Sequence, residues 1–502
     1  MQVVKPTNNL ISRSLSALKW SYLGVMARIV LQLVAQIAIA RLIGPKAFGS
    51  ASAAIFVMTF VNLIVELGLG SSLIQKAQLT SDDLRLVMRR VFLAAGVGAM
   101  VVYFSAETIA DFWGDRAVMP LLQALVVALL AQAGGVVSLA LLRRELDFKW
   151  IQVAQISGYF VGFFVIGITV AVFDGGAWSL VFAWIAQNLC TTLLLFWRAR
   201  HPVNFWGPTA NADQSIQSYG VRILLTNLAN WVIENIDNFM VGRAFGTYAL
   251  GTYTVSYNLV RTPTNHLVTS IQQVLFPASA RSMGNNDDHG LAYLVVVWGI
   301  SLVAFPIFLG IAALSGTVVD ALYGSKWLTA ADILLPLALG MPFHAVMAVG
   351  GPMLWGRGEA GREMRVQFVI APILVLVLGA MANMSPTAMA WGVAGVYVFR
   401  AIWIQAQVAT AMKISVASVC WAIFPGVVIG AVVASILWIA NAYWIAMSVT
   451  SLPRLLLAGF AGLIMSALAL LFVRKLLPKT IGIALRKRTD LPMVMQRVLG
   501  RN

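Results

Sequence analysis

Residues 39–49 read IARLIGPKAFG, and residues 241–251 read VGRAFGTYALG. Both stretches follow the pattern Arg-x-x-Gly-x-x-x-x-Gly, and each lies between two long apolar runs. The matching residues keep one offset of 202 (243 minus 41), with Arg41, Gly44 and Gly49 in the first copy and Arg243, Gly246 and Gly251 in the second. A repeat at this distance predicts two related halves built on one plan.

The composition indicates a membrane protein. Hydrophobic side chains make up 60% of the 502 residues and charged ones 11%, whereas soluble domains have about 45–50% apolar and about 25% charged residues. A membrane-spanning helix needs roughly 20 mostly apolar residues. We therefore predict an all-α integral membrane protein with about 14 transmembrane helices, arranged as two pseudo-symmetric six-helix lobes plus two C-terminal helices.

The apolar runs define the expected spans and domains. The spans are residues 17–40, 50–74, 86–106, 118–141, 150–173, 177–197, 219–241, 252–276, 291–314, 330–355, 364–383, 387–411, 418–440 and 452–473. A polar, proline-containing connection near residues 198–218 divides the halves. This gives an N-terminal lobe at 1–205, a C-terminal lobe at 206–415, two further helices at 416–475 and a basic tail at 476–502.

The net charge of +16 is explained by topology rather than by nucleic acid. Most of the 35 Lys and Arg residues fall in loops on one side of the predicted membrane and in the tail. Such a bias marks the cytoplasmic side, so we expect both termini in the cytoplasm. The basic tail is expected to rest on anionic lipid, and no nucleic-acid partner is expected.

Polar residues inside spans point to a cavity. Arg28, Gln32 and Gln36 recur every fourth residue and share one helical face. A charge in mid-span costs at least about 2.5–3.5 kcal/mol and normally faces a polar cavity or a partner. The 202-residue offset carries these positions to Asn230, Glu234 and Asn238, with Asp237 adjacent. Two polar stripes in one register predict a hydrated cavity between the halves.

Other spans add charges with more than one interpretation. Arg261 and Asn265 lie in span 252–276 and are expected to line the cavity. Arg400 could do the same or form an interhelical ion pair, and Glu66 could line the cavity or pair within the bundle. Glu234 and Asp237 could pair with arginines, or bind a coupling proton or sodium ion. The sequence leaves these alternatives open.

The repeated stretch itself is expected at the external helix ends. There Arg41 and Arg243 complement the C-terminal helix dipole, and Gly44 and Gly246 suit the position just past a helix end. The motif glycines, Gly49 and Gly251 included, are also expected to help each lobe flex. No Walker A, GxSxG, HExxH or CxxC motif is present, and the four histidines lack metal-ligand spacing. We expect no catalytic residue, metal or cofactor, and at most a proton or sodium gradient as energy source.

Taken together, these features resemble a known family. The predicted spans, the two lobes, ARLIGPKAFG at residues 40–49, ENIDNFMVGRAFGTYALGTYTVSYNL at 234–259 and LFPASAR at 275–281 are similar to Wzx-type polysaccharide transporter (PST) flippases. These belong to the multidrug/oligosaccharidyl-lipid/polysaccharide (MOP) exporter superfamily, and the likeness is to the colanic-acid/xanthan subgroup.

The resemblance implies a function and a location. Such a flippase moves undecaprenyl-pyrophosphate-linked oligosaccharide from the inner to the outer leaflet of the bacterial cytoplasmic (inner) membrane by alternating access, alongside membrane lipids and polymerase or co-polymerase machinery. Cationic cavity residues of the family match Arg28 and Arg261, which would bind pyrophosphate. Gln32, Gln36, Asn230 and Asn265 would then contact sugar hydroxyls.

One departure and two alternatives remain. Glu234 and Asp237 would repel an anionic cargo unless they are paired or protonated. A multidrug or other small-solute antiporter of the same superfamily is the first alternative, although Arg28 disfavours cationic drugs. A membrane-embedded polysaccharide polymerase or ligase is the second, and the short external loops around Asp111 and Ser325 argue against it.

Overall fold

The computed structural model describes residues 7–66, 69–75, 79–200, 215–281 and 286–476, and this part of the chain is helical throughout apart from its connecting turns. The chain divides into two compact units, Met1–Gly251 and Thr252–Asn502. This division falls inside a long helix, whereas the repeat places the lobe boundary between residues 205 and 206. Contacts between residues define the two units, whereas sequence similarity defines the two lobes, so the two divisions need not coincide. The lobe boundary stays a prediction.

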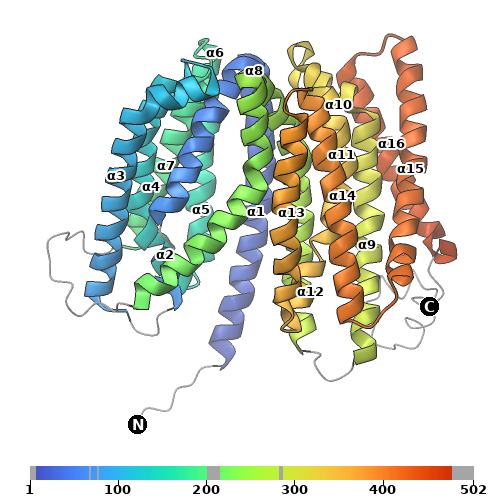
Figure 1. Cartoon of the computed structure of the whole chain (residues 1–502), viewed down its shortest axis with the longest axis horizontal. Helices are drawn as coiled ribbons and strands as arrows, with labels where there is room; N and C mark the ends of the chain where they lie inside the picture. The colour runs from blue at the N-terminus through green and yellow to red at the C-terminus, as the bar shows by residue number, and fades with distance from the viewer. Residues whose placement is uncertain (1–6, 67–68, 76–78, 201–214, 282–285, 477–502) are drawn as a thin grey trace. The chain divides into compact units, whose positions relative to one another are not determined.

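The first unit contains seven helices and the beginning of an eighth within its described residues (Figure 1). They are α1 (Thr7–Glu66), α2 (Leu69–Gln75), α3 (Ser81–Trp113), α4 (Val118–Arg144), α5 (Phe148–Tyr159), α6 (Ile168–Val172), α7 (Trp178–Arg198) and the first part of α8 (Ser215–Arg281). A π-helical stretch, η1 (Phe160–Gly167), joins α5 to α6. The apolar core lies where α1, α3 and α4 pack, around Met58, Val91 and Leu122.

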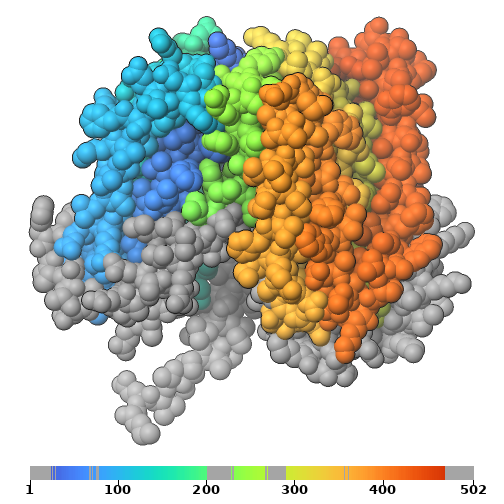
Figure 2. Space-filling view, viewed as in Figure 1, coloured from blue at the N-terminus to red at the C-terminus, as the bar shows by residue number. Residues whose placement is uncertain are grey.

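The second unit continues from α8. Its elements are α9 (Asn286–Ala313), α10 (Ser315–Tyr323), the 3-10 turn η2 (Ser325–Trp327), α11 (Thr329–Met347), α12 (Gly350–Gly356), α13 (Ala360–Met381), α14 (Pro386–Ala411), α15 (Val416–Ala446) and α16 (Ser451–Leu476). Helices α13 and α14 lie side by side on the visible face of this unit (Figure 2). Fully buried Phe305, Phe308 and Trp327 mark its core.

The helices are long and apolar enough for a membrane. Among the described residues, 11 helices meet the length and composition needed to cross a bilayer. The prediction of an all-α integral membrane fold is confirmed, and the count of about 14 spans stays a prediction. Predicted span 17–40 and the first part of span 50–74 lie in α1, whereas the end of span 50–74 lies in α2. Spans 219–241 and 252–276 both lie in α8.

Both long helices break at the repeated glycine. Gly44 in α1 has φ 78° and ψ 172°, and Gly246 in α8 has φ 80° and ψ −178°. Only glycine adopts this combination without steric cost, because any Cβ would clash with its own backbone. The repeat in sequence is therefore also a repeat in backbone geometry. At each of the two glycines the chain turns from one predicted span into the next.

The second glycines of the two motifs cross at close range. A Cβ added to Gly49 would collide with the carbonyl oxygen of Thr247, and one added to Gly251 would collide with that of Pro45. Both glycines are buried. The two copies of the motif therefore pack backbone against backbone, an approach that no larger residue permits.

A carboxylate beside this crossing holds both motif segments. Asp115, in the turn between α3 and α4, accepts hydrogen bonds from Ser50 Oγ (2.6 Å) and Thr247 Oγ1 (2.8 Å), and from the backbone N–H of Ala117 (3.0 Å). Partial burial opposes ionisation of Asp115. The three hydrogen bonds and the charge of Lys46 outweigh burial and hold the pKa of Asp115 below its ordinary value.

Substitution of Gly49 tests the crossing. Gly49→Ala should lower the stability of the purified protein by roughly 1–3 kcal/mol, because the new methyl group must displace the Thr247 backbone. Gly96→Ala is the matched control, since a Cβ at Gly96 in α3 meets no neighbouring atom. Thermal unfolding in detergent measures both. An unchanged midpoint for Gly49→Ala would contradict the crossing.

Substitution of Asp115 tests the carboxylate. Asp115→Asn should lower the thermal midpoint by the same amount at all pH values between about pH 8 and about pH 5. Because the folded-state pKa is depressed, the stabilisation is present above the unfolded pKa and is lost as pH falls through the folded pKa. The difference between the proteins should therefore shrink below about pH 4. A difference that grows on acidification would refute this account.

Candidate functional site

The first unit contains a polar pocket of about 280 Å³. It is walled by α1, α2, α4, α5 and α7, all from the same unit. Its polar lining consists of two arginines, one carboxylate and several neutral amides and hydroxyls: Arg28, Asn62, Glu66, Gln132, Arg143, Gln155, Gln187, Asn188, Thr191 and Thr192. Such a concentration of polar groups among spanning helices marks a functional site by default.

Small residues allow the pocket walls to meet. A Cβ added to Gly135 in α4 would come 2.9 Å from Thr192 Oγ1 in α7, and one added to Gly158 in α5 would come closer still to Thr191 Oγ1. Helices in membranes pack tightly where glycines remove side-chain bulk. The α7 hydroxyls are thereby carried against α4 and α5, where Thr192 Oγ1 donates to the Ala131 carbonyl (2.9 Å).

Arg28 is the cation of this pocket with a described side-chain partner. Its Nη1 donates to Gln155 Oε1 of α5 at 2.5 Å, and the side chain is half-buried. A guanidinium has five N–H donors, and the bond to Gln155 uses one of them. A neutral amide does not neutralise the positive charge. Because Gln155 is neutral, Arg28 can bind an anion without losing an ionic partner at this contact.

Neutral amides form a second part of the pocket. Gln132 Nε2 donates to Asn188 Oδ1 (2.6 Å), and Asn188 Nδ2 donates to the Trp184 carbonyl (2.7 Å). Within the described residues, Gln132 Oε1 is buried with no hydrogen-bond partner. A buried acceptor of this kind is costly unless a ligand or water donates to it. The arrangement offers hydrogen bonds to hydroxyl groups beside the charge of Arg28.

The predicted polar stripes are only partly gathered here. Arg28 and Glu66 line the pocket, whereas Gln32 is exposed and Gln36 half-buried on α1 outside it. Asn230 lies in α8, and its side chain falls outside the described part of the chain. The predicted cavity between the halves stays a prediction.

The acidic residues of α8 have local partners. Asp237 is buried, and its Oδ1 accepts from the backbone N–H (2.8 Å) and the side-chain Nδ2 (3.2 Å) of Asn238. Glu234 is exposed. Whether either residue couples transport to an ion stays a prediction.

The second unit gathers a cationic cluster around His344 of α11. The charges of Arg261 in α8 and Arg400 in α14 both act on this imidazole. The Arg261 guanidinium lies 5.2 Å from the ring centroid of Tyr257, a cation–π contact. Tyr397 of α14 lies against His344, with ring centroids 5.0 Å apart. Two arginines predicted from separate spans thus act on one half-buried histidine.

The remaining predicted residues are placed as follows. Asn265 is exposed on α8, and Arg41 is exposed on α1. The guanidinium of Arg243 lies 4.9 Å over the ring of Phe112. Helix capping by Arg41 and Arg243 stays a prediction.

Comparison with known proteins now identifies the family. The family described as polysaccharide biosynthesis protein matches residues 38–332, more than half of the chain. The chain belongs to this family. The match confirms the resemblance to polysaccharide transporters and supports transport rather than catalysis.

The chain is also similar to named proteins of polysaccharide biosynthesis. The teichuronic acid biosynthesis protein TuaB of Bacillus subtilis (strain 168) is 24% identical over 352 residues, which cover 69% of this chain and 72% of TuaB. The lipopolysaccharide biosynthesis protein WzxC of Escherichia coli (strain K12) is 23% identical over 350 residues, covering 68% and 69%. The lipid II flippase MurJ, in an inward closed conformation, shares the fold, with TM-score 0.67, 12% identity, and coverage of 93% and 100%.

Several residues of the polar pocket were not identified from the sequence. Gln132 stands alone in an apolar run, Gln155 follows Gln152, and Asn188 follows Gln187. His344, near the charges of the second unit, lacks metal-ligand spacing. An available signal was the presence of neutral amides in mid-span, which are uncommon for the same reason as charges. Their grouping could not be read because it depends on contacts across helices.

A double-mutant cycle tests the Arg28–Gln155 contact. Gln155→Leu should destabilise the protein by about 1–3 kcal/mol, because it leaves a half-buried guanidinium without this acceptor. Arg28→Met in the same chain should recover part of that loss, giving a coupling energy of about 0.5–3 kcal/mol. Gln32→Leu, at an exposed position on the same helix, is the control. Additive effects of the two substitutions would show that the contact carries no energy.

Proposed function

We propose that this protein moves lipid-linked polysaccharide repeat units from the inner to the outer leaflet of the bacterial inner membrane. The observation that carries the proposal is Arg28, a cation inside a polar pocket of spanning helices, in a member of the polysaccharide biosynthesis family. The cargo is expected to be an undecaprenyl-pyrophosphate-linked oligosaccharide, which polymerase or co-polymerase machinery would then receive.

The chemistry of the pocket suits such a cargo. A pyrophosphate carries several anionic oxygens, and the planar guanidinium fork binds such oxygens bidentately. The amides of Gln132, Gln155 and Gln187 and the hydroxyl of Thr191 offer donors and acceptors to sugar hydroxyls. Moving this head group through hydrocarbon without such partners would leave its charge unsolvated.

The cluster of the second unit supports the same function. Arg261 of α8 and Arg400 of α14 bring two positive charges to the surroundings of His344, and a cationic drug would be repelled by them and by Arg28. This disfavours the multidrug antiporter alternative. Asn265, exposed on α8 near Arg261, remains a candidate for sugar contact.

Alternating access would use the repeated motifs. By the charge distribution, the crossing of Gly49 and Gly251 lies at the external ends of the spans. In this conformation Asp115 ties Ser50 to Thr247. An outward-open state would require the two segments to separate and these hydrogen bonds to exchange for water.

Energy would come from a proton or sodium gradient. Glu66 lines the same pocket as Arg28, so a proton or cation bound there would change the charge that the cargo meets. Glu234 and Asp237 are further coupling candidates. No resident metal or cofactor is proposed.

Charge removal tests the proposal. Arg28→Gln and Arg261→Gln should each slow flipping of a fluorescent lipid-linked oligosaccharide in proteoliposomes by about tenfold or more, since hydrogen bonds to charged groups contribute about 1.5–3 kcal/mol. Arg28→Lys should be intermediate, because lysine keeps the charge but loses the fork. Arg89→Gln, at an exposed position on α3, is the control. Wild-type rates for both glutamine variants would refute the proposal.

A further inference from the structure

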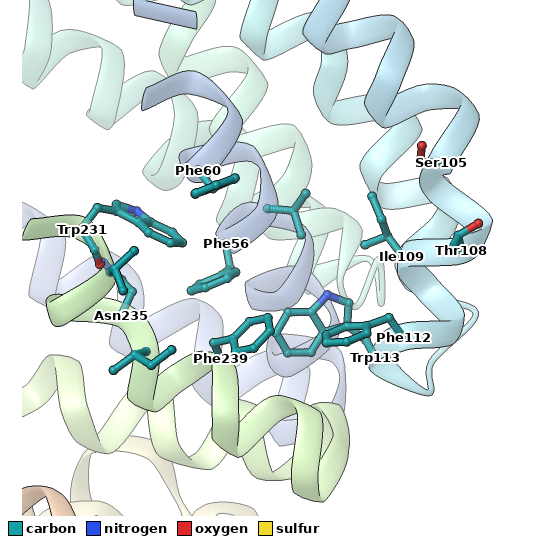
Figure 3. A pocket seen from close by; sticks show the side chains of 13 residues that line it. Phe56, Phe60, Ser105, Thr108, Ile109, Phe112, Trp113, Trp231, Asn235 and Phe239 are labelled. Atoms are coloured by element: carbon teal, nitrogen blue, oxygen red, sulfur yellow. The ribbon is translucent and has the colours of Figure 1, made fainter. Parts of the chain in front are cut away.

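The first unit holds a second pocket of different character. Its volume is about 530 Å³, and its walls come from α1, α3 and the first part of α8 (Figure 3). Aromatic rings dominate the lining. They are Phe56, Phe60, Phe112, Trp113, Trp231 and Phe239.

The rings brace one another, so the pocket is built before any ligand arrives. The centroid of Trp231 lies 4.9 Å from that of Phe56 and 5.0 Å from that of Phe60. The Phe239 ring stacks on Phe112 at 5.6 Å and meets Trp113 edge-on at 5.9 Å. Such offset and edge-to-face pairs each contribute beyond their buried area.

A hydrocarbon chain is the chemistry that fits this lining. The polar side chains at the wall are few, and Asn235 among them already donates to the Trp231 carbonyl (2.8 Å). A dry apolar cavity of about 150 Å³ binds benzene, so by proportion this pocket holds about 20 carbon atoms. Its lining residues Phe112 and Val232 are 40% and 38% exposed, which leaves the pocket open at the surface of spanning helices.

A cation lies beside one ring of the pocket wall. The guanidinium of exposed Arg243 lies 4.9 Å over the ring of Phe112, which itself lines the pocket. A lipid whose chain lay among the rings would therefore present its phosphate to Arg243, where a charge-assisted bond forms. The pairing of an apolar pocket with a cation beside its wall matches a phosphorylated lipid rather than a neutral one.

We propose that this pocket binds the head-proximal part of the polyprenyl chain of a phosphorylated polyprenyl lipid, with its phosphate at Arg243. The occupant is argued from the ring lining, the opening among spanning helices and the charge of Arg243. The choice of a polyprenyl over an acyl chain rests on the proposed function, in which the cargo carries such a chain. The remainder of the chain lies in the bilayer.

Binding to the purified full-length protein in detergent tests the proposal. Polyprenyl phosphate, polyprenol and phosphatidylglycerol are the probes, and native mass spectrometry counts the bound lipid. Thr108→Trp places a ring into the pocket from an exposed position on α3 and should weaken polyprenyl phosphate binding at least tenfold. Phe104→Trp, one turn earlier, 80% exposed and outside the lining, should bind as the wild type does.

Arg243→Gln separates head from chain. It should weaken polyprenyl phosphate binding by roughly fivefold, as expected for loss of a bond to a charged group, and leave polyprenol binding unchanged. Equal loss for both lipids would overturn the phosphate contact. Ser105→Phe fills the same pocket and replaces Thr108→Trp if that variant is not recovered folded.

Two results would overturn the chain site: wild-type binding by the filled variants, or equal competition by phosphatidylglycerol, which would mark a general lipid site. Failure of the binding site and failure of the proposed flipping function give different results. Absent flipping in proteoliposomes together with pocket-dependent binding would refute the function and keep the site. Normal flipping, together with lipid binding that the pocket substitutions leave unchanged, would support the function and refute the site.

Discussion

The close crossing of Gly49 and Gly251 is the constraint on which the first unit depends. Each glycine admits the backbone of the other motif copy because neither has a side chain. The contact fixes α1 against α8 at one point, although the two segments lie about 200 residues apart in sequence. Asp115 adds hydrogen bonds to both segments at that point, and the aromatic rings of α1, α3 and α8 pack in the same unit. Backbone approach, carboxylate and ring packing therefore stabilise a single arrangement.

The helical membrane fold could be predicted because its signals are local. Apolar runs of spanning length and the breaks between them are visible in any window of about 20 residues. The repeat placed Gly44 and Gly246 at equivalent positions, and they share one backbone conformation. The second glycine of each motif packs closely against the backbone of the other copy, and this contact depends on a partner that sequence spacing does not reveal. The expected hinge role of the motif glycines stays a prediction.

The candidate site was predictable only where a charge stood out. Arg28 and Glu66 line the polar pocket, as their cost in hydrocarbon indicated. The amides beside them were missed because neutral side chains in a span carry no charge that demands a partner, and because the Arg28–Gln155 bond joins residues 127 positions apart. His344 was dismissed for lack of metal-ligand spacing. Its neighbours Arg261 and Arg400 come from other helices, and no periodicity within one segment reports such a grouping.

One helical segment connects the two pockets of the first unit. In the second part of α1, Phe56 and Phe60 are four residues apart and line the aromatic pocket, while Asn62 and Glu66 are four residues apart and line the polar one. Residues four apart share a helical face, and the two pairs project in different directions. The segment is thus a common wall between the polar pocket and the aromatic pocket. Because side chains in a packed interior shift together, a rotation of this segment would reshape both pockets at once, as movement of an amphiphilic cargo requires.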